Sequence, residues 1–540
     1  MTKLSINQNK KAEEFFAPLI FLIFGYFLTI FCFYIYGDLV VTSDSAADLI
    51  LARLLNREGG ILTHNFFYST ELIIIDTQFI FKLALKVFPN DWHMARVFAH
   101  MILLAMYLGT MAVFVKAAKI GPKGLWGVAF CAYPIGFYYT INLSWSMFYS
   151  INGVISFLLL AVLFVALRKD DKVWLYTSVL FVLSFISGIR TLRTIAQLNI
   201  PLFFSAVILL FCRKFKKHFG FADHRVRDYD KKLMLYSSLM LFESIVGYGF
   251  NELYLSKKYT YTQYSGSVWE DFSIVRILDS VRDYIACHGW HSYVSIISLE
   301  GISSAVSIVF GLSVLLSVIL LFFRFADRLS DEEYLFVLFT LVTLVVCAFI
   351  LSHTSVCLPY HWVPVMPFGY ICQAIALKYI SIDLKLTRNI KGGLFVGLIV
   401  FIVSLSWILV PSATQEDNMD RRAYIELINE MENKGYTKGV GSYWNSNVAT
   451  ELTDGRVEMW AFSSVDSVTP FCWLQEKSHA TFPEGDVFVI LSMEEYSQFS
   501  GDIREYVESY NEYYVVLTFE DGTDYASILN NAYIGSQDNE

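Results

Sequence analysis

Long apolar stretches recur along the first three quarters of the chain, separated by short polar segments. Each stretch is close to the roughly 20 residues that a helix needs to cross the hydrocarbon core of a bilayer. The first stretch is longer than a signal-peptide core, and no small-residue cleavage site follows it, so we expect it to remain as a span. We predict eleven transmembrane helices, near residues 15–37, 97–115, 124–141, 150–167, 173–188, 195–212, 233–250, 301–323, 334–352, 362–380 and 393–411.

Every second loop of this pattern is basic. Positively charged loops stay on the cytoplasmic side of a membrane, so the pattern predicts a cytoplasmic N-terminus and an extracytoplasmic C-terminus. The basic loops are Lys116/Lys119/Lys123, Arg168/Lys169/Lys172, Arg213/Lys214/Lys216/Lys217, Arg324/Arg328 and Lys385/Arg388/Lys391.

The first outer loop, residues 38–96, is about 60 residues long, far more than a connection needs. An amphipathic pattern over 44–58 predicts a surface helix that stops at Gly59-Gly60. The pattern over 71–88 is apolar enough to suggest a twelfth span. It contains Asp76, Lys82 and Lys86, however, and counting it would place the basic loops outside. We therefore predict a second surface helix there.

After residue 411 the pattern changes to short strand-like runs and amphipathic helices. About 130 residues suffice for one small α/β domain. We therefore expect a transmembrane domain over 1–411 and a soluble α/β domain over 412–540. The predicted strands cover 439–443, 457–462, 487–491 and 513–519, and the predicted helices cover 421–433 and 493–510.

Composition agrees with a membrane protein, because 55% of the 540 residues are hydrophobic and only 17% are charged. The net charge of −9 hides an asymmetry: residues 411–540 carry 24 acidic and 7 basic side chains, whereas the rest carries 26 and 34. The basic excess lies in short loops and reports topology, so no nucleic-acid partner is indicated. Gly439-Val-Gly441 lacks the third glycine of a dinucleotide fingerprint, and no P-loop occurs.

The densest polar cluster follows the first span, in Thr42-Ser43-Asp44-Ser45-Ala-Ala-Asp48. Asp44 and Asp48 share one face of a helix. For Asp48 a structural role is available, because Ser45 and Asp48 have the spacing of a capping box. Asp44 precedes that cap. A carboxylate held partly buried at the membrane face is a candidate general base.

Glu71 opens the predicted second surface helix, either as an N-terminal helix acid or as a contact to substrate. Arg190 and Arg193 follow the fifth span on the predicted outer side. Lipid headgroups explain such arginines, and so does a bound phosphate or pyrophosphate. Tyr360-His361-Trp362, between the ninth and tenth spans, belongs either to an aromatic belt or to a donor site. The cofactor is unknown: a divalent metal is compatible with the chain, although no ligand motif is seen.

These features resemble the GT-C superfamily of membrane glycosyltransferases, in particular bacterial relatives of protein mannosyltransferases and of the lipid A aminoarabinose transferase, a family 39-type group. The resemblance lies in the layout of spans, in the surface helices of the first outer loop, and in the acidic motif after the first span. Ser43-Asp44-Ser45-Ala-Ala-Asp48-Leu-Ile-Leu-Ala52 is similar to the family's Asp-Glu-x-x-Tyr-x-x-x-Ala, with Ser45 at the Glu position and Asp48 at the aromatic one. Tyr360-His361-Trp362-Val-Pro364 is similar to its late Arg-Tyr-x-x-Pro feature.

The resemblance implies an inverting transferase of the cell envelope, with a polyprenyl-phosphate-linked sugar as donor and an extracytoplasmic glycan, lipid or protein as acceptor. Asp44 and Glu71 would be catalytic, with Asp44 as the base. Asp48, Arg190, Arg193, Tyr360 and His361 would bind substrate. A polytopic transporter or lipid-linked glycan flippase is the alternative, although charges crowd the outer boundary instead of mid-span positions. A polysaccharide polymerase and a membrane anchor for the acidic domain fit less well.

Overall fold

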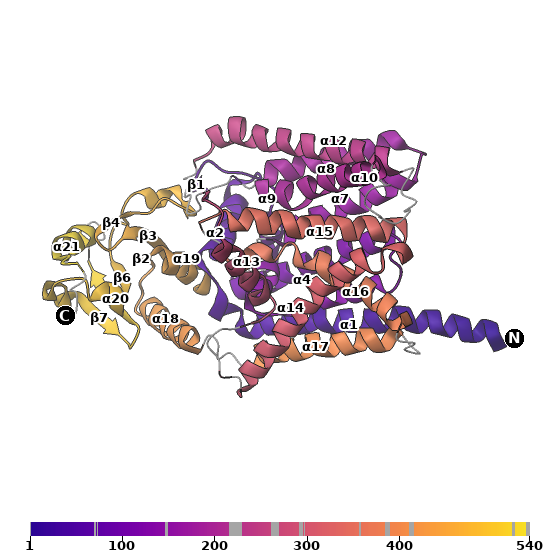
Figure 1. Cartoon of the computed structure of the whole chain (residues 1–540). Helices are drawn as coiled ribbons and strands as arrows, with labels where there is room; N and C mark the ends of the chain where they lie inside the picture. The colour runs from indigo at the N-terminus through magenta and orange to yellow at the C-terminus, as the bar shows by residue number, and fades with distance from the viewer. Residues whose placement is uncertain are drawn as a thin grey trace. The chain divides into compact units, whose positions relative to one another are not determined.

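The computed structural model describes residues 2–69, 72, 74–145, 149–214, 229–260, 269–290, 295, 297–355, 358–383, 389–409, 415–520 and 524–535. The chain divides into two compact units (Figure 1). The helical unit comprises residues 1–32, 101–253 and 265–410, and the mixed unit comprises 33–100, 254–264 and 411–540. Residues 33–100 thus pack with the C-terminal residues, and the functional division at residue 411 stays a prediction.

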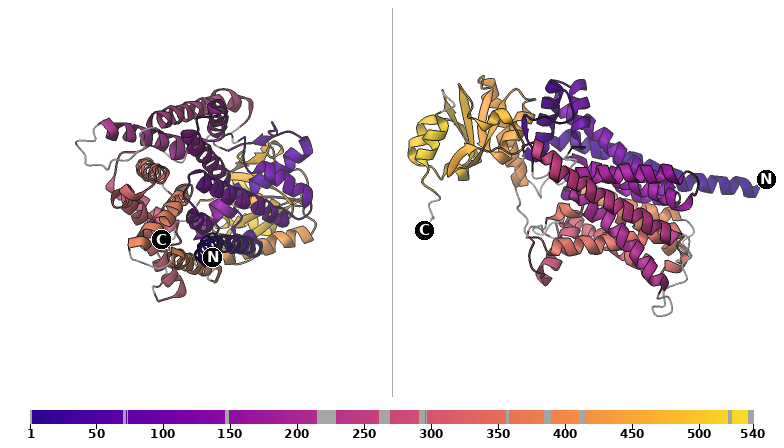
Figure 2. Two further views of the ribbon diagram at one scale, coloured as in Figure 1. Left: turned by 90° about the vertical axis from the view of Figure 1, so that its right-hand side faces the viewer. Right: turned by 90° about the horizontal axis from the view of Figure 1, so that it is seen from above.

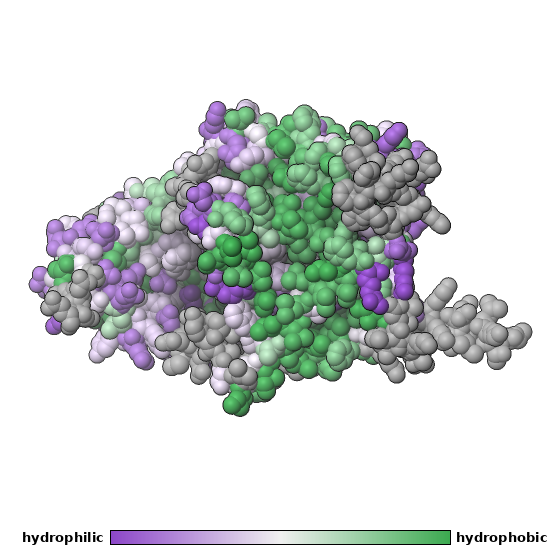
Figure 3. Space-filling view, viewed as in Figure 1, coloured by the Kyte–Doolittle hydropathy of each residue, from purple (hydrophilic) through white to green (hydrophobic). Residues whose placement is uncertain are grey.

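The helical unit consists of long apolar helices that run side by side (Figure 2). Within the described residues, eight helices are long and apolar enough to cross a membrane. The chain is therefore a multi-pass membrane protein, and the face seen in Figure 3 is mainly hydrophobic over these helices. The spanning helices are α1 (Thr2–Val40), α4 (Trp92–Ala117), α7 (Ser150–Arg168), α8 (Val173–Arg190), α9 to α10 (Leu192–Lys214), α12 (Tyr229–Phe250), α14 (Leu299–Phe323) and α15 (Asp331–Ser352).

Further helices complete this unit. α16 (Met366–Asp383) and α17 (Asn389–Leu409) lie where the tenth and eleventh spans are predicted. The amphipathic helix α13 (Ile274–Ala286) and the 3-10 turn η7 (Pro359–Trp362) lie between longer helices in the chain. α8 and α12 approach each other so closely that a Cβ atom at Gly188 would overlap the carbonyl oxygen of Ser244.

One predicted span is wrong as a continuous helix. Over 124–141, α5 (Gly124–Phe130) is followed by a turn, by α6 (Phe137–Thr140) and by the π-helical turn η1 (Ile141–Trp145). Pro134 disfavours a helical conformation in the residue before it, and Gly136 adopts a positive φ of 82°. The run is apolar throughout, but its backbone chemistry breaks the helix.

The mixed unit is built on a six-stranded sheet in the order β4-β3-β2-β6-β8-β7. β2 is parallel to β3 and β6, and the remaining pairs are antiparallel. The strands are β2 (Lys438–Ser442), β3 (Glu458–Ser464), β4 (Ser467–Pro470), β6 (Val487–Ser492), β7 (Val507–Tyr510) and β8 (Tyr514–Phe519). All four predicted strands are present.

Helices cover both faces of this sheet. α21 (Tyr525–Ala532) and the 3-10 turn η10 (Gly501–Tyr506) pack on one face, and α18 (Gln415–Asn433) and α19 (Tyr443–Leu452) pack on the other. The predicted helix over 493–510 is wrong beyond its first turn: α20 (Met493–Tyr496) is followed by η10 and β7. Gly439 lies in the centre of β2, where an added Cβ would overlap the side chains of Met459 and Phe488, so sheet packing explains this glycine.

Residues from the first predicted outer loop complete the mixed unit. α2 (Ser43–Glu58) packs against α19 and against α3 (Gln78–Val87). β1 (Phe66–Phe67) pairs with β5 (Gln475–Glu476), and Val41 and Ala46 enter the apolar core between α18, α19 and the sheet. A helix is present where one is predicted over 44–58, and the helix predicted over 71–88 is shorter, beginning at Gln78. The place of both helices at the membrane surface stays a prediction.

Candidate active site

The start of α2 is fixed by a capping box one turn earlier than the sequence suggests. Thr42 is the N-cap: its Oγ1 accepts a bond from the Ser45 amide at 3.3 Å, and its amide donates to Ser45 Oγ at 3.0 Å. The capping box expected between Ser45 and Asp48 is therefore wrong, because Ser45 already serves as its third residue. Asp48 is released from that role.

Asp44 lies in the first turn of α2, where the helix dipole favours a carboxylate. The hydroxyl of Tyr443, the first residue of α19, donates a hydrogen bond to Asp44 Oδ1. Desolvation raises the pKa of the half-buried Asp44 carboxyl, and the bond from Tyr443 opposes this rise. A carboxylate with raised basicity has the property that a general base needs.

Asp48 lies one turn further along α2 and accepts a hydrogen bond from Thr77 Oγ1 at 2.9 Å. Desolvation and the nearby Asp76 carboxylate raise the pKa of Asp48 to about 8, and the Thr77 bond and the Arg96 charge act against that rise. At neutral pH this side chain is therefore mostly protonated. Asp44 and Asp48 thus differ: Asp44 accepts a bond from Tyr443 at the helix start, whereas Asp48 is mostly protonated at neutral pH.

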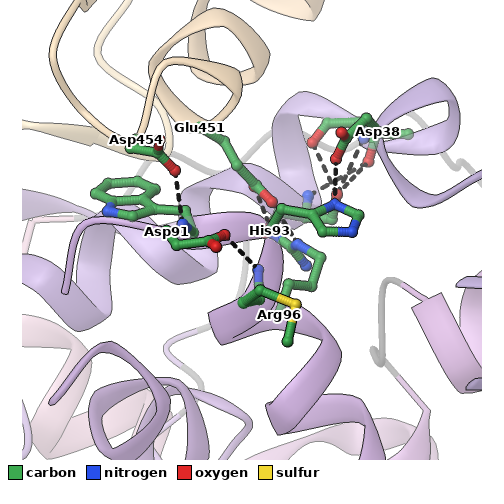
Figure 4. A network of polar contacts seen from close by, with 10 residues as sticks. Asp38, Asp91, His93, Arg96, Glu451 and Asp454 are labelled. Atoms are coloured by element: carbon green, nitrogen blue, oxygen red, sulfur yellow. Dashed lines mark hydrogen bonds and ion pairs between the residues drawn. The ribbon is translucent and has the colours of Figure 1, made fainter. Parts of the chain in front are cut away.

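Figure 4 shows a buried ion pair between Arg96 and Glu451, which contacts the start of α2. Arg96 of α4 is only 2% exposed and donates from Nε and Nη2 to the two carboxylate oxygens of Glu451 in α19. Nη2 also donates to the carbonyl oxygen of Ser45 at 2.8 Å. The guanidinium therefore joins the start of α2 to α19, and its charge partly offsets the surrounding carboxylates.

Further polar contacts around this ion pair join neighbouring parts of the mixed unit (Figure 4). His93 Nδ1 lies 2.7 Å from Asp38 Oδ1, and the Trp92 amide donates to Asp454 Oδ1 at 2.6 Å. At the far end of α2, Glu476 accepts bonds from Arg53 at 3.2 Å and from Arg57 at 2.6 Å.

The helical unit holds a separate basic cluster. Arg190, at the end of α8, is 1% exposed and donates to Asn152 Oδ1 of α7. Arg193 is exposed; its Nη1 donates to the Tyr149 hydroxyl at 2.8 Å, and its guanidinium lies 5.2 Å from the centre of that ring. Asn152 also accepts a bond from Thr194 Oγ1 at 3.4 Å.

His361 lies in the field of this cluster. Burial, and then the charge of Arg193, lower the pKa of His361 to about 4, so the imidazole is neutral at physiological pH. Its Nδ1 accepts a bond from the Leu358 amide at 3.3 Å, and its ring centre lies 4.7 Å from that of Tyr360. Of the substrate-binding residues predicted here, Arg193, His361 and Tyr360 therefore form one neighbourhood.

The predicted site residues divide between the two units. Asp44 and Asp48 belong to the mixed unit, whereas Arg190, Arg193, Tyr360 and His361 belong to the helical unit. Glu71 lies outside the described residues. Over the described ranges, no group of three or more His, Cys, Asp or Glu side chains could hold a metal ion.

Three residues at these clusters were not predicted: Tyr443, Glu451 and Asn152. Tyr443 and Glu451 contact partners about 400 and 355 residues earlier in the chain. No local pattern marks such pairs, and Asn152 reads as an ordinary polar residue near the end of a span.

No protein-family model matches the sequence, and no curated protein matches it. Solved structures do match. The chain is similar to ArnT from Cupriavidus metallidurans in the apo state, with a TM-score of 0.54 and 10% identity over 92% of this chain and 97% of that one. The chain therefore shares the fold of this ArnT structure. The structure of the same ArnT bound to undecaprenyl phosphate matches with a TM-score of 0.52, the same identity and the same coverage.

Proposed function

We propose that this protein is a membrane glycosyltransferase that moves a sugar from a polyprenyl-phosphate donor to an extracytoplasmic acceptor, with Asp44 as the general base. The observation that carries the proposal is the Asp44 carboxylate itself. It lies at the capped start of α2, directly after the first span, with raised basicity, in a chain of GT-C fold.

In the proposed reaction, Asp44 takes the proton of an acceptor hydroxyl as that oxygen attacks the anomeric carbon of the sugar. The bond between this carbon and the phosphate oxygen breaks, and polyprenyl phosphate leaves with its electron pair. Attack opposite the leaving group inverts the anomeric centre. General-base catalysis of this kind contributes roughly 10²–10⁴-fold to a rate.

The basic cluster of the helical unit suits the donor. Arginine binds phosphate oxygens through paired donors, and the exposed guanidinium of Arg193 lies beside the Arg190–Asn152 pair. Undecaprenyl phosphate bound to a protein of the same fold supports a lipid phosphate as its ligand. A neutral His361 and Tyr360 would contact the sugar or phosphate without adding charge, Asp48 would contact substrate, and Glu71 would be catalytic together with Asp44.

Loop charges support the orientation that this reaction needs. The basic loops would lie in the cytoplasm with the N-terminus, and residues 412–540 would lie outside with Asp44. The formal charge of −17 over 411–540 disfavours a polyanionic acceptor.

The test is release of undecaprenyl phosphate from synthetic undecaprenyl-phosphate-linked hexoses and aminopentoses by the full chain in nanodiscs. This release reports transfer to any hydroxyl acceptor, including water. We expect Asp44→Asn to lower the rate at least 100-fold. The control is Glu58→Gln, an exposed acid at the other end of α2, which we expect to retain wild-type activity. Equal rates for wild type and Asp44→Asn would show that Asp44 is not the base. Donor movement across proteoliposomes without release would favour the flippase.

A further inference from the structure

A side chain from the C-terminal part of the chain is hydrogen-bonded to the proposed base. Tyr443 begins α19 and donates its hydroxyl proton to Asp44 Oδ1. Two more bonds tie the same helix starts together: Ser43 Oγ donates to the Tyr443 carbonyl oxygen, and Asn447 Nδ2 donates to the Ser43 carbonyl oxygen at 3.3 Å. The hydroxyl is therefore aimed from a fixed backbone.

The ring of Tyr443 is also held. It is 7% exposed and packs among aromatic neighbours, with ring centres 4.8 Å away for Trp473, 5.3 Å for Trp444 and 5.5 Å for Phe471. A ring packed on several sides has few alternative rotamers. This packing therefore keeps the Tyr443 hydroxyl directed at Asp44.

Within this pair, Tyr443 is the hydrogen-bond donor and the Asp44 carboxylate is the acceptor. Burial and the Asp44 charge raise the pKa of the Tyr443 phenol well above its usual value, so the hydroxyl stays neutral and can only donate to an ionised carboxylate. The bond occupies Oδ1 and leaves Oδ2 for a second hydroxyl. A hydroxyl donor favours the charged form of a carboxylate, against the desolvation that disfavours it.

We propose that Tyr443 is a positioning residue for Asp44: its hydroxyl orients the carboxylate and keeps it ionised, so that residues 411–540 complete the catalytic centre. This inference rests on the proposed role of Asp44. It assigns to the C-terminal residues a part in the reaction itself, in addition to any contact with the acceptor.

Other charged side chains lie on α2 and on the elements packed around it. Asp48 lies on the same helix, with Arg53 and Arg57 further along it. Glu451 projects from α19 and is paired with Arg96 of α4, and Asp76 precedes α3. None of these groups is altered when the Tyr443 hydroxyl alone is removed, so Tyr443→Phe isolates one hydrogen bond.

The test compares Tyr443→Phe with Tyr424→Phe in the full chain. Tyr424 is a matched control, because it is fully buried in the same unit and its hydroxyl donates to the Asn445 carbonyl oxygen at 2.8 Å, away from Asp44. The first readout is pH-dependent carbodiimide labelling of Asp44, resolved from Asp48 by tandem mass spectrometry. Only the protonated acid reacts, so this readout needs no sugar donor.

We expect Tyr443→Phe to move the Asp44 labelling midpoint upward by about one pH unit, as loss of one hydrogen bond to a charged group implies. The acid limb of the pH–rate profile for undecaprenyl phosphate release should move by the same amount, so that kcat falls up to roughly tenfold at pH values below both midpoints. Tyr424→Phe should leave both midpoints unchanged. In the Asp44→Asn background, Tyr443→Phe should cause no further loss of rate.

Unchanged labelling and rate profiles in Tyr443→Phe would overturn the positioning role, and so would a faster enzyme, which would identify Tyr443 as an inhibitory cap. Failure of the proposed function gives a different result: the labelling midpoint shifts, but Asp44→Asn has no effect on turnover.

Discussion

The two polar clusters of this protein use opposite arrangements. In the helical unit, Arg190 donates to Asn152 and Arg193 donates to Tyr149. In the mixed unit, two carboxylates with raised pKa values lie near the buried Arg96, which is paired with Glu451. One cluster is built around two arginines, and the other contains carboxylates of raised basicity.

This difference matches two chemical tasks. Arginine binds phosphate oxygens through paired donors, whereas removal of a hydroxyl proton is favoured by a carboxylate whose pKa is raised. The contrast also predicts that arginines in the two clusters respond differently to substitution. Replacing Arg96 should lower the stability of the fold, whereas replacing Arg193 should weaken ligand binding.

The largest expected effect is on Arg96. Arg96→Met leaves Glu451 buried without its partner, which should lower the free energy of unfolding by about 3–5 kcal/mol. Thermal unfolding of the full chain in detergent measures this. The double variant Arg96→Met, Glu451→Met should be more stable than Arg96→Met, because both buried charges are gone. An Arg96→Met variant as stable as wild type would show that the pair with Glu451 does not stabilise the fold.

Asp48→Asn should change stability in a pH-dependent way. The folded state binds a proton up to about pH 8, whereas the unfolded chain releases it near pH 4, so the wild type loses stability as pH rises from about 4 to about 8. Asparagine has no proton to lose and can still accept from Thr77. We expect the variant to be more stable than wild type by about 4 kcal/mol at pH 9, and equal at pH 5. Equal melting temperatures at both pH values would contradict the raised pKa.

Arg193→Gln tests the other side of the comparison. Its side chain is exposed, so we expect the melting temperature to stay at the wild-type value while the Kd for undecaprenyl phosphate rises about tenfold. Binding can be followed by native mass spectrometry. Arg282→Gln is the matched control, because Arg282 is exposed in the same unit and pairs with Asp279 on its own helix. A weaker complex in both variants would indicate general charge attraction only.

The smallest effect is expected at the end of α2. Glu476→Gln weakens contacts to Arg53 and Arg57, which are partly exposed, and should cost about 1 kcal/mol at low salt and less in 1 M NaCl. Thermal unfolding at the two salt concentrations measures it. A cost that salt does not change would mean that packing dominates over charge at this contact.

The sequence predicted elements well where one local pattern decides the structure. Apolar runs located the long helices, and Gly59 ended α2 as expected, with a φ of 77°. It failed where local signals compete. Ser45 could begin a capping box or complete one, and Thr42 settled the matter by capping first. Over 124–141, apolar length outweighed Pro134 and Gly136 in the prediction, whereas backbone geometry decided the structure.

The candidate site was only partly accessible from sequence for a different reason. Asp44 stands out because an acid follows a span, and Arg190 and Arg193 stand out because cations lie where few are expected. Tyr443 and Glu451 lack any such contrast, since they lie in an acidic, aromatic segment of ordinary composition. Their importance arises from contacts across about 400 and 355 residues, which only the folded chain displays.

The shared core of the mixed unit has a consequence for how the protein is made. Val41 and Ala46 complete an apolar cluster whose other members come from α18, α19 and the sheet. A ribosome adding about 5–20 residues per second reaches those members on the order of half a minute after Ala46 has been synthesised. Until then Val41 and Ala46 lack these C-terminal partners, and the environment of Asp44 does not exist. Biosynthesis therefore delays the assembly of the proposed base until the last quarter of the chain has emerged and folded.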